Sequence, residues 1–300
     1  MLKLLTYLLK NGIATSTKIC PPLEQNARGL PYVTQSPCIG EACNACASTC
    51  PTEAIEIKDS SPEASVKLDL GACVGCGLCT EICNTGTLIE NLSTQTARTS
   101  REELILTNIA KREPNASNEP NGSENGARAP RFFDRSIHAR VVTTGCTACD
   151  LEIGASTNPV FDLDRFGVHI VASPRHADVL ISTGPAGKGM QNALRRCYDA
   201  MTEPRRVIAM GSCAISGGVH KAGYANANGL DKILPVDVYV PGCPPHPWSV
   251  IHGVLTARGT APNSELLVKK KAKVTITDKH TADLETRLTI RSRDASSGKI

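Results

Sequence analysis

A group of cysteines that repeats at a fixed interval constrains this chain more than any other feature. Nine of its fourteen cysteines lie in the first 90 residues, and a C-x2-C-x3-C run recurs there after 33 residues. The repeated cysteines are Cys43, Cys46 and Cys50 and then Cys76, Cys79 and Cys83. A further cysteine breaks the repeat, because Cys73 maps onto Gly40 while the nearest cysteine is Cys38. Such an internal repeat predicts two similar metal sites within one small domain.

This spacing is typical of chains that bind two iron–sulfur cubanes. Three closely spaced thiolates bind three irons of one cubane, and the fourth thiolate of the run reaches the other cubane. The spacing therefore predicts cluster 1 on Cys38, Cys43, Cys46 and Cys83, and cluster 2 on Cys50, Cys73, Cys76 and Cys79. If the shifted Cys38 does not ligate, cluster 1 is expected to be a three-iron cluster, [3Fe–4S], or a labile cluster.

Two other kinds of metal site fit parts of the pattern less well. A structural zinc site more usually shows two well-separated C-x2-C pairs. The plant-type [2Fe–2S] spacing, C-x4-C-x2-C, matches Cys38, Cys43 and Cys46 literally. The 33-residue repeat and the Cys50-Pro51 pair argue against that interpretation.

The repeated region, from Cys38 to about Glu90, resembles the bacterial two-cluster ferredoxins. The resemblance implies an α+β ferredoxin-like domain with two [4Fe–4S] clusters. The preceding segment, LLKNGIATSTKICPPLEQNARGLP, resembles the segment before the cysteine motifs in the ferredoxin subunits of formate hydrogenlyase complexes.

Composition divides the chain into four parts. We expect a cluster-binding domain at 1–90 with an amphipathic N-terminal helix, a flexible polar linker at 91–130, a second domain at 131–262 and a basic tail at 263–300. The tail carries the net charge of +4 but no aromatic residue, which disfavours nucleic-acid binding. The N-terminal leucines are too few to span a bilayer and no cleavage signal follows them, so the chain is expected to be cytoplasmic.

The second domain alternates apolar runs with helical stretches. Short runs rich in valine or isoleucine, each ended by glycine, serine or proline, are typical of buried strands. They cover 140–145, 167–173, 177–184, 205–211 and 236–242, with helical spacing at 190–201 and 246–257. This alternation predicts an α/β flavodoxin-like domain with an open, mostly parallel sheet.

Four cysteines follow three of these predicted strands. Cys146 and Cys149 follow the first strand, and Cys213 and Cys243 follow the last two, with Gly145, Gly211 and Gly242 in the three loops. Ligands gather at the carboxyl ends of strands in such sheets. We therefore expect these four thiolates to hold one further cubane, the proximal cluster, although any one of them alone could be a buried structural cysteine.

The sequence segments around these cysteines show a second resemblance. GCTACDLEIGASTNPVFDLDRFG, GSCAISGG and PVDVYVPGCPPHP resemble the small subunit of membrane-bound, group 4 [NiFe] hydrogenases, formate hydrogenlyase included. They are also similar to the complex I subunit that carries the terminal cluster. That relative has two adjacent cysteines where this chain has Cys146-x2-Cys149, so the resemblance favours the hydrogenase arrangement. It implies a proximal [4Fe–4S] cluster on Cys146, Cys149, Cys213 and Cys243, facing a large catalytic subunit.

Other polar residues near these motifs allow two interpretations. Glu152 could relay protons at the subunit interface, or it could be an ordinary carboxylate near a helix N-terminus. Arg175 and His176 could hydrogen-bond around the cluster or form a surface ion pair. Cys20 and Cys197 belong to no motif and are expected to be plain thiols.

Three predicted clusters and the absence of a nucleotide-binding motif favour an electron-transfer subunit. We expect electrons to pass between the ferredoxin-type clusters and the proximal cluster, with the catalytic centre on a hydrogenase-type large subunit. Further expected partners are the membrane subunits of the complex and an electron donor or acceptor protein, with the chain peripheral on the inner face of the cell membrane. The alternatives are a complex I-like oxidoreductase whose large subunit lacks nickel, and an assembly scaffold that transfers no electrons.

Overall fold

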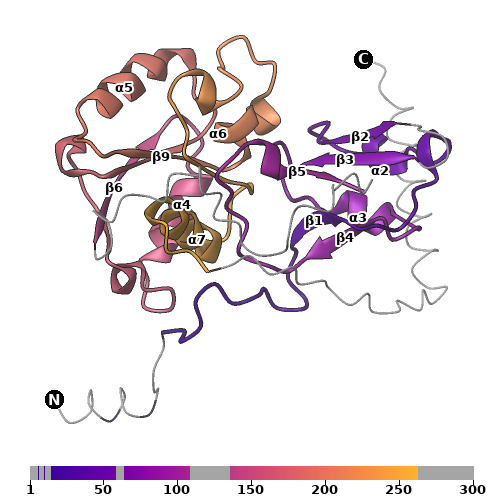
Figure 1. The fold of residues 1–300 in the computed structure, drawn as a ribbon, viewed down its shortest axis with the longest axis horizontal. Coiled ribbons are helices and arrows are strands. Elements are labelled where there is room, and N and C mark those ends of the chain that lie inside the picture. Colours follow the sequence, from indigo (N-terminus) through magenta and orange to yellow (C-terminus); the bar gives the residue numbers. More distant parts are fainter. Residues whose placement is uncertain (1–5, 7–9, 11–14, 59–63, 109–135, 263–300) are drawn as a thin grey trace, which may run out of the picture. The chain divides into compact units, whose positions relative to one another are not determined.

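The computed structural model describes residues 6, 10, 15–58, 64–108 and 136–262. All of these belong to one compact unit. Residues 30–91 form a small region of short strands and helices, which we call the repeat region, and residues 136–262 form the sheet region (Figure 1). Apart from residues 6 and 10, the predicted N-terminal helix lies outside the described residues, as does the basic tail at 263–300.

The two halves of the cysteine repeat exchange their strands in the repeat region. The elements of this region are β1 (Leu30–Val33), η1 (Gly40–Ala42), α2 (Ala45–Ser48), β2 (Ile55–Lys58), β3 (Ser65–Asp69), α3 (Leu78–Ile82) and β4 (Leu88–Asn91). The strand before the first cysteine group, β1, pairs with β4, which follows the second group. Likewise β2, which follows the first group, pairs antiparallel with β3, which precedes the second. This exchange brings the end of each cysteine run beside the start of the other.

A five-stranded parallel sheet forms the centre of the sheet region. Its strands are β6 (Ile137–Thr143), β7 (Val168–Ile170), β8 (Val179–Thr183), β9 (Arg206–Met210) and β10 (Val238–Val240), in the order β10-β9-β8-β6-β7. Numbered along the chain from the opposite edge, this order is 2-1-3-4-5, one of the two common doubly wound arrangements. Each of the five predicted strands is found, and the predicted open, parallel α/β sheet is confirmed.

Helices cover both faces of this sheet (Figure 1). The longer helices are α4 (Ala148–Ser156), α5 (Lys188–Asp199) and α7 (Pro247–Arg258), and the short helix α6 (Ser212–Ser216) follows β9. Short 3-10 turns complete the region: η4 (Leu163–Phe166), η5 (Pro174–His176), η6 (Gly218–His220) and η7 (Leu230–Lys232). Alternate strand residues divide between two apolar layers, one with α4 and α7 and one with α5 and α6, as expected for strands buried on both faces.

The start of the predicted linker is ordered, which corrects its boundary at Asn91. Residues 92–108 contain η2 (Glu102–Leu104) and β5 (Ile105–Thr107), and β5 pairs antiparallel with β3. The residues of β5 lie on a sheet edge where alternate side chains are exposed. The rest of the predicted linker, from residue 109, lies outside the described residues.

Residues 93–104, which we call the crossing segment, attach the repeat region to the sheet region. The Ser249 hydroxyl donates to the Thr94 carbonyl at 2.8 Å, and the Ala97 amide donates to His252 Nδ1 at 3.2 Å. Arg98 then pairs with Tyr239 of β10 through two backbone hydrogen bonds. The crossing segment thus extends the sheet edge by one antiparallel bridge.

Acidification is expected to weaken this attachment through His252. Burial lowers the pKa of the His252 imidazole from 6.5 to about 4, because the ring would lose its hydration on charging. Below pH 6.5 the unfolded chain binds a proton that the folded chain does not. The free energy of unfolding should therefore fall by about 1.4 kcal/mol per pH unit until about pH 4.

His252→Asn tests this effect, since its amide oxygen can accept from Ala97 without titrating. Its thermal unfolding midpoint should fall less than that of the wild type between neutral pH and about pH 5. The exposed His176→Asn is the control and should follow the wild type. Equal losses in all three proteins would contradict the role of His252.

Candidate iron–sulfur centres

The structure brings the four cysteines predicted for cluster 1 around one cavity. Its lining includes Cys38, Cys43, Cys46 and Cys83. Burial raises the pKa of the Cys46 thiol to about 11, and the nearby thiols of Cys38 and Cys83 raise it further. Cys38, the shifted member of the repeat, therefore lies with the group to which the spacing assigned it. We call these four residues the cluster 1 set.

The cysteines predicted for cluster 2 line a second, narrower cavity. This cluster 2 set consists of Cys50, Cys73, Cys76 and Cys79. Burial raises the pKa of Cys73 and of Cys79 to about 12, and the neighbouring thiols of the set contribute to both shifts. Cys46 also raises the pKa of Cys79, which indicates that the two sets are neighbours.

Backbone amides donate to sulfur in the same way in both sets. Gly40 N–H donates to Cys38 Sγ at 3.4 Å, and Gly75 N–H donates to Cys73 Sγ at 3.3 Å, each from two residues further along the chain. This shared contact makes Cys38 the structural counterpart of Cys73 despite its different spacing. Hydrogen bonds to sulfur favour the thiolate form and tune the reduction potential of a bound cluster.

The last cysteine of each run also has matching contacts. Ala54 N–H donates to Cys50 Sγ at 3.2 Å, and Leu88 N–H donates to Cys83 Sγ at 3.4 Å. Burial alone would raise the pKa of Cys83, but the Thr85 hydroxyl and neighbouring backbone amides outweigh it and lower the pKa overall.

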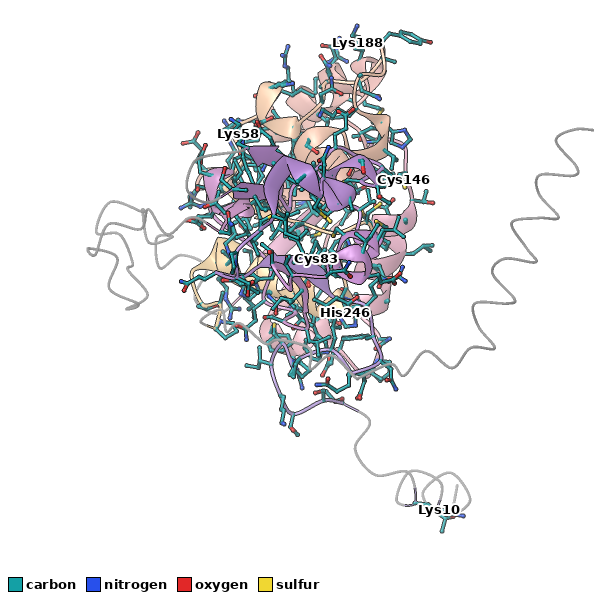
Figure 2. The ribbon with its side chains drawn as sticks, turned by 90° about the vertical axis from the view of Figure 1, so that its right-hand side faces the viewer. Lys10, Lys58, Cys83, Cys146, Lys188 and His246 are labelled. Carbon is teal, nitrogen blue, oxygen red and sulfur yellow. The ribbon has the colours of Figure 1, made fainter. Side chains whose placement is uncertain are left out.

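A third group, the proximal set, lies at the carboxyl ends of the parallel strands. Burial raises the pKa of Cys149 to about 12, with further contributions from Cys146, Cys213 and Cys243. Figure 2 labels one cysteine from each region: Cys146, in the loop after β6, and Cys83, which follows α3 in the repeat region. Gly211 permits this convergence: its φ is +85°, and a Cβ there would lie 2.6 Å from Cys149 Sγ.

The chemistry of these groups fits cubane clusters better than single metal ions. No three His, Cys, Asp or Glu side chains within the described ranges are placed to hold one metal ion. A cubane does not need such convergence, because each thiolate binds a different iron. Burial raises the pKa of Cys46, Cys73 and Cys149 to about 11 to 12, so binding of a metal centre would displace the protons of these thiols. All fourteen cysteines of the chain are free of disulfides.

Glu152 of α4 lines a cavity of about 750 Å³ together with Cys243 and His246. The same cavity is bounded by Val74 and Gly75, from the loop of the cluster 2 set. Burial lowers the pKa of His246, which keeps that imidazole neutral. The position of Glu152 beside a proximal cysteine is compatible with the proton relay that the sequence suggested, and that role stays a prediction.

Asp150 is a site residue that the sequence analysis missed. Its carboxylate accepts from the Thr143 hydroxyl at 2.6 Å and from the Thr183 hydroxyl at 2.8 Å. These threonines end β6 and β8, so Asp150 fixes the start of α4, and with it Cys149, against two strands. The sequence feature that could have pointed to Asp150 is the threonine near the end of each of these two predicted strands.

The structure also places the remaining polar residues and cysteines that the sequence analysis discussed. Arg175 and His176 are exposed and precede β8, at the amino-terminal ends of the parallel strands, whereas the cysteine loops follow the carboxyl ends. This position excludes hydrogen bonding around the cluster, one of their two interpretations. Cys20 is buried in the core, where its thiol donates to the Trp248 carbonyl at 3.5 Å. Cys197 lies on α5, outside all three sets, and both cysteines fit the expectation of plain thiols.

Together the grouped thiols and the parallel sheet define an iron–sulfur protein. The family described as "NADH ubiquinone oxidoreductase, 20 Kd subunit" matches residues 146–257, and the "4Fe-4S dicluster domain" matches residues 37–87. The chain belongs to this oxidoreductase subunit family and carries a dicluster domain ahead of it. It is therefore an iron–sulfur subunit of an oxidoreductase, and the predicted resemblance is confirmed.

Three relatives show the range of this family. The chain is 44% identical to the probable membrane-bound hydrogenase subunit mbhJ of Pyrococcus furiosus, over 44% of this chain and 79% of the relative. It is 43% identical to formate hydrogenlyase subunit 7 of Escherichia coli, over 40% of this chain and 47% of the relative. It is 50% identical to an NADH-quinone oxidoreductase subunit of Desulfovibrio desulfuricans, over 38% of this chain and 62% of the relative.

Proposed function

We propose that the chain is the electron-transfer subunit of a group 4 [NiFe] hydrogenase complex of the formate hydrogenlyase type. The observation that carries this proposal is the grouping of twelve cysteines into three sets of four within one compact unit. In this proposal the repeat region is a ferredoxin-like domain that holds two [4Fe–4S] clusters. The proximal set holds a third cluster, next to a catalytic large subunit.

Each part of the chain has a defined task in this function. The iron–sulfur clusters, when bound, supply the one-electron chemistry. The amides of Gly40, Gly75, Ala54 and Leu88 donate hydrogen bonds to the ligand sulfurs. Asp150 and Gly211 shape the proximal loops. The described residues thus hold, space and insulate the redox groups.

The assembly in which the chain acts is inferred from its relatives. None of the described helices combines the length and the apolar composition that crossing a bilayer requires. Two of the relatives are named as subunits of a membrane-bound hydrogenase and of formate hydrogenlyase. We therefore place the chain at the inner face of the cell membrane, held by partner subunits.

A complex I-like oxidoreductase without nickel is the second candidate, favoured by the identity to the NADH-quinone oxidoreductase subunit of Desulfovibrio desulfuricans. The metal of the large subunit separates the two. The complex should be purified anaerobically through a tag on this chain, and its nickel content and hydrogen evolution measured with a reduced dye. Nickel in a large subunit with two C-x2-C pairs is the expected result. A large subunit that lacks both nickel and these pairs would favour the second candidate.

A further inference from the structure

The turn that carries Cys73 meets the helix that carries Cys213. We call this contact, between residues 69–73 and α6, the seam. The Ser212 hydroxyl donates to the Cys73 carbonyl at 2.6 Å, and the Ser216 hydroxyl donates to the Gly71 carbonyl at 3.0 Å. Ser212 is fully buried, so this hydrogen bond is shielded from water.

Close packing fixes the distance across the seam. A Cβ on Gly71 would lie 2.7 Å from Ile215 Cγ2, so only glycine lets the turn come this near to α6. The turn itself is held by Asp69, whose carboxylate accepts from the Gly71 amide and from the Arg101 guanidinium, both at 2.8 Å. The seam is thus a packed contact and not a loose encounter of two domains.

Ser212 touches loops from both neighbouring cysteine sets. The single hydroxyl proton of Ser212 goes to the Cys73 carbonyl at 2.6 Å, and the hydroxyl oxygen also lies 3.0 Å from the Gly242 carbonyl. The Ser212 amide donates to that same Gly242 carbonyl at 2.9 Å. Gly242 precedes Cys243, and Ser212 itself precedes Cys213, so two proximal cysteines are covalent neighbours of these contacts. The cavities of both sets are lined by residues of the repeat region alone, and the Ser212 contact reaches Cys73 of the cluster 2 set.

We propose that Ser212 is the positioning residue that couples the cluster 2 set to the proximal set, an inference that rests on the proposed function. Its hydrogen bond joins the backbone of Cys73 to that of Cys213 and gives electrons a bonded route across the seam. One electron crosses in each transfer, which oxidises one redox group and reduces the other, and no bond forms or breaks. The cluster 2 set, and not the cluster 1 set, exchanges electrons with the proximal set.

Ser212→Ala tests this role, with Ser216→Ala as the matched control. Both variants remove one serine hydroxyl from the same helix and the same seam, but only Ser212 reaches a cysteine of a cluster set. The anaerobically purified full chain should be partly reduced with a fast photoreductant. Freeze-quenched EPR then follows how electrons redistribute between the cluster 2 and proximal signals. Iron content and the midpoint potentials are measured in parallel.

We expect Ser212→Ala to slow the redistribution several-fold while iron content and potentials stay at wild-type values. Ser216→Ala should keep the wild-type rate. Equal rates in the two variants, with full iron in both, would overturn the proposal. If the wild-type chain itself lacks three clusters, the proposed function fails instead, and this outcome is visible before any variant is compared.

Ser212→Cys provides a second variant if Ser212→Ala loses iron. It keeps the side-chain volume and replaces the hydroxyl by a weak donor. Full iron with slower redistribution supports the proposal, and full iron with the wild-type rate overturns it. Iron loss from both Ser212 variants, with Ser216→Ala intact, also overturns it, because Ser212 would then serve cluster retention and not coupling.

Discussion

Replacing Gly211 by alanine should remove the proximal cluster and leave the other two in place. Gly211 has φ +85° and ψ 159°, a region that is essentially reserved for glycine. The new Cβ would lie 2.6 Å from Cys149 Sγ, closer than such atoms approach in folded proteins. The backbone strain, about 1–3 kcal/mol, adds to this clash. Since α6 is short and packed on both sides, the thiol of Cys149 would have to move out of the set.

Iron analysis is the measurement for Gly211→Ala. The iron content should fall from about twelve to about eight per chain, the loss of one four-iron cluster. Gly154→Ala is the control, since no atom lies within 4 Å of a Cβ built there and the residue lies within α4. Full iron and an unchanged proximal EPR signal in Gly211→Ala would contradict the proximal assignment.

The second large effect concerns the exchange of the last cysteine between the two halves of the repeat. Cys50 belongs by sequence to the first run but lines the cavity of the cluster 2 set, whereas Cys83 ends the second run and lies in the cluster 1 set. Cys50→Ala should therefore damage cluster 2, and Cys83→Ala should damage cluster 1. Each variant loses between one and four irons, depending on whether a three-iron cluster survives.

The magnetic interaction with the proximal cluster distinguishes these variants. Because the seam joins the cluster 2 set to the proximal set, we expect cluster 2 to broaden the reduced proximal EPR signal, and Cys50→Ala should change or abolish this broadening. Cys83→Ala should retain it. Cys197→Ala removes a thiol outside all sets and should keep about twelve irons. Loss of the interaction in Cys83→Ala, with its retention in Cys50→Ala, would contradict the exchange.

The sequence predicted the structural features that have a local pattern, which are the apolar strands and the repeated cysteine groups. The strands of the sheet region are continuous apolar runs, and a strand buried on both faces needs little more than that pattern. The two cysteine groups of the repeat region followed from spacing, because ligation by two runs leaves few arrangements of the chain. The place of Cys38 could not be settled by spacing, since its equivalence to Cys73 depends on the amide of Gly40.

What the sequence did not predict depends on contacts between distant residues. The sequence of the crossing segment is polar and shows no helical or strand periodicity. Its residues Thr94, Ala97 and Arg98 nevertheless form hydrogen bonds with α7 and β10. The sequence shows Ser212 only as a serine at the start of a helix, and its hydrogen bond to the distant Cys73 carbonyl could not be predicted. Arg175 and His176 lie in the connection from the carboxyl end of β7 to the amino end of β8, and the sequence did not show at which of these ends they lie.

The count of iron and acid-labile sulfide per chain, with EPR of the oxidised and reduced states, tests the central claim most directly. The protein should be purified anaerobically. About twelve irons, reduced cubane signals and no oxidised three-iron signal are predicted, since the proposed function assigns one four-iron cluster to each of the three sets of four cysteines. About eleven irons with an oxidised three-iron signal would show that Cys38 does not ligate. About four irons or fewer would contradict the account, because the repeat region would then hold no clusters.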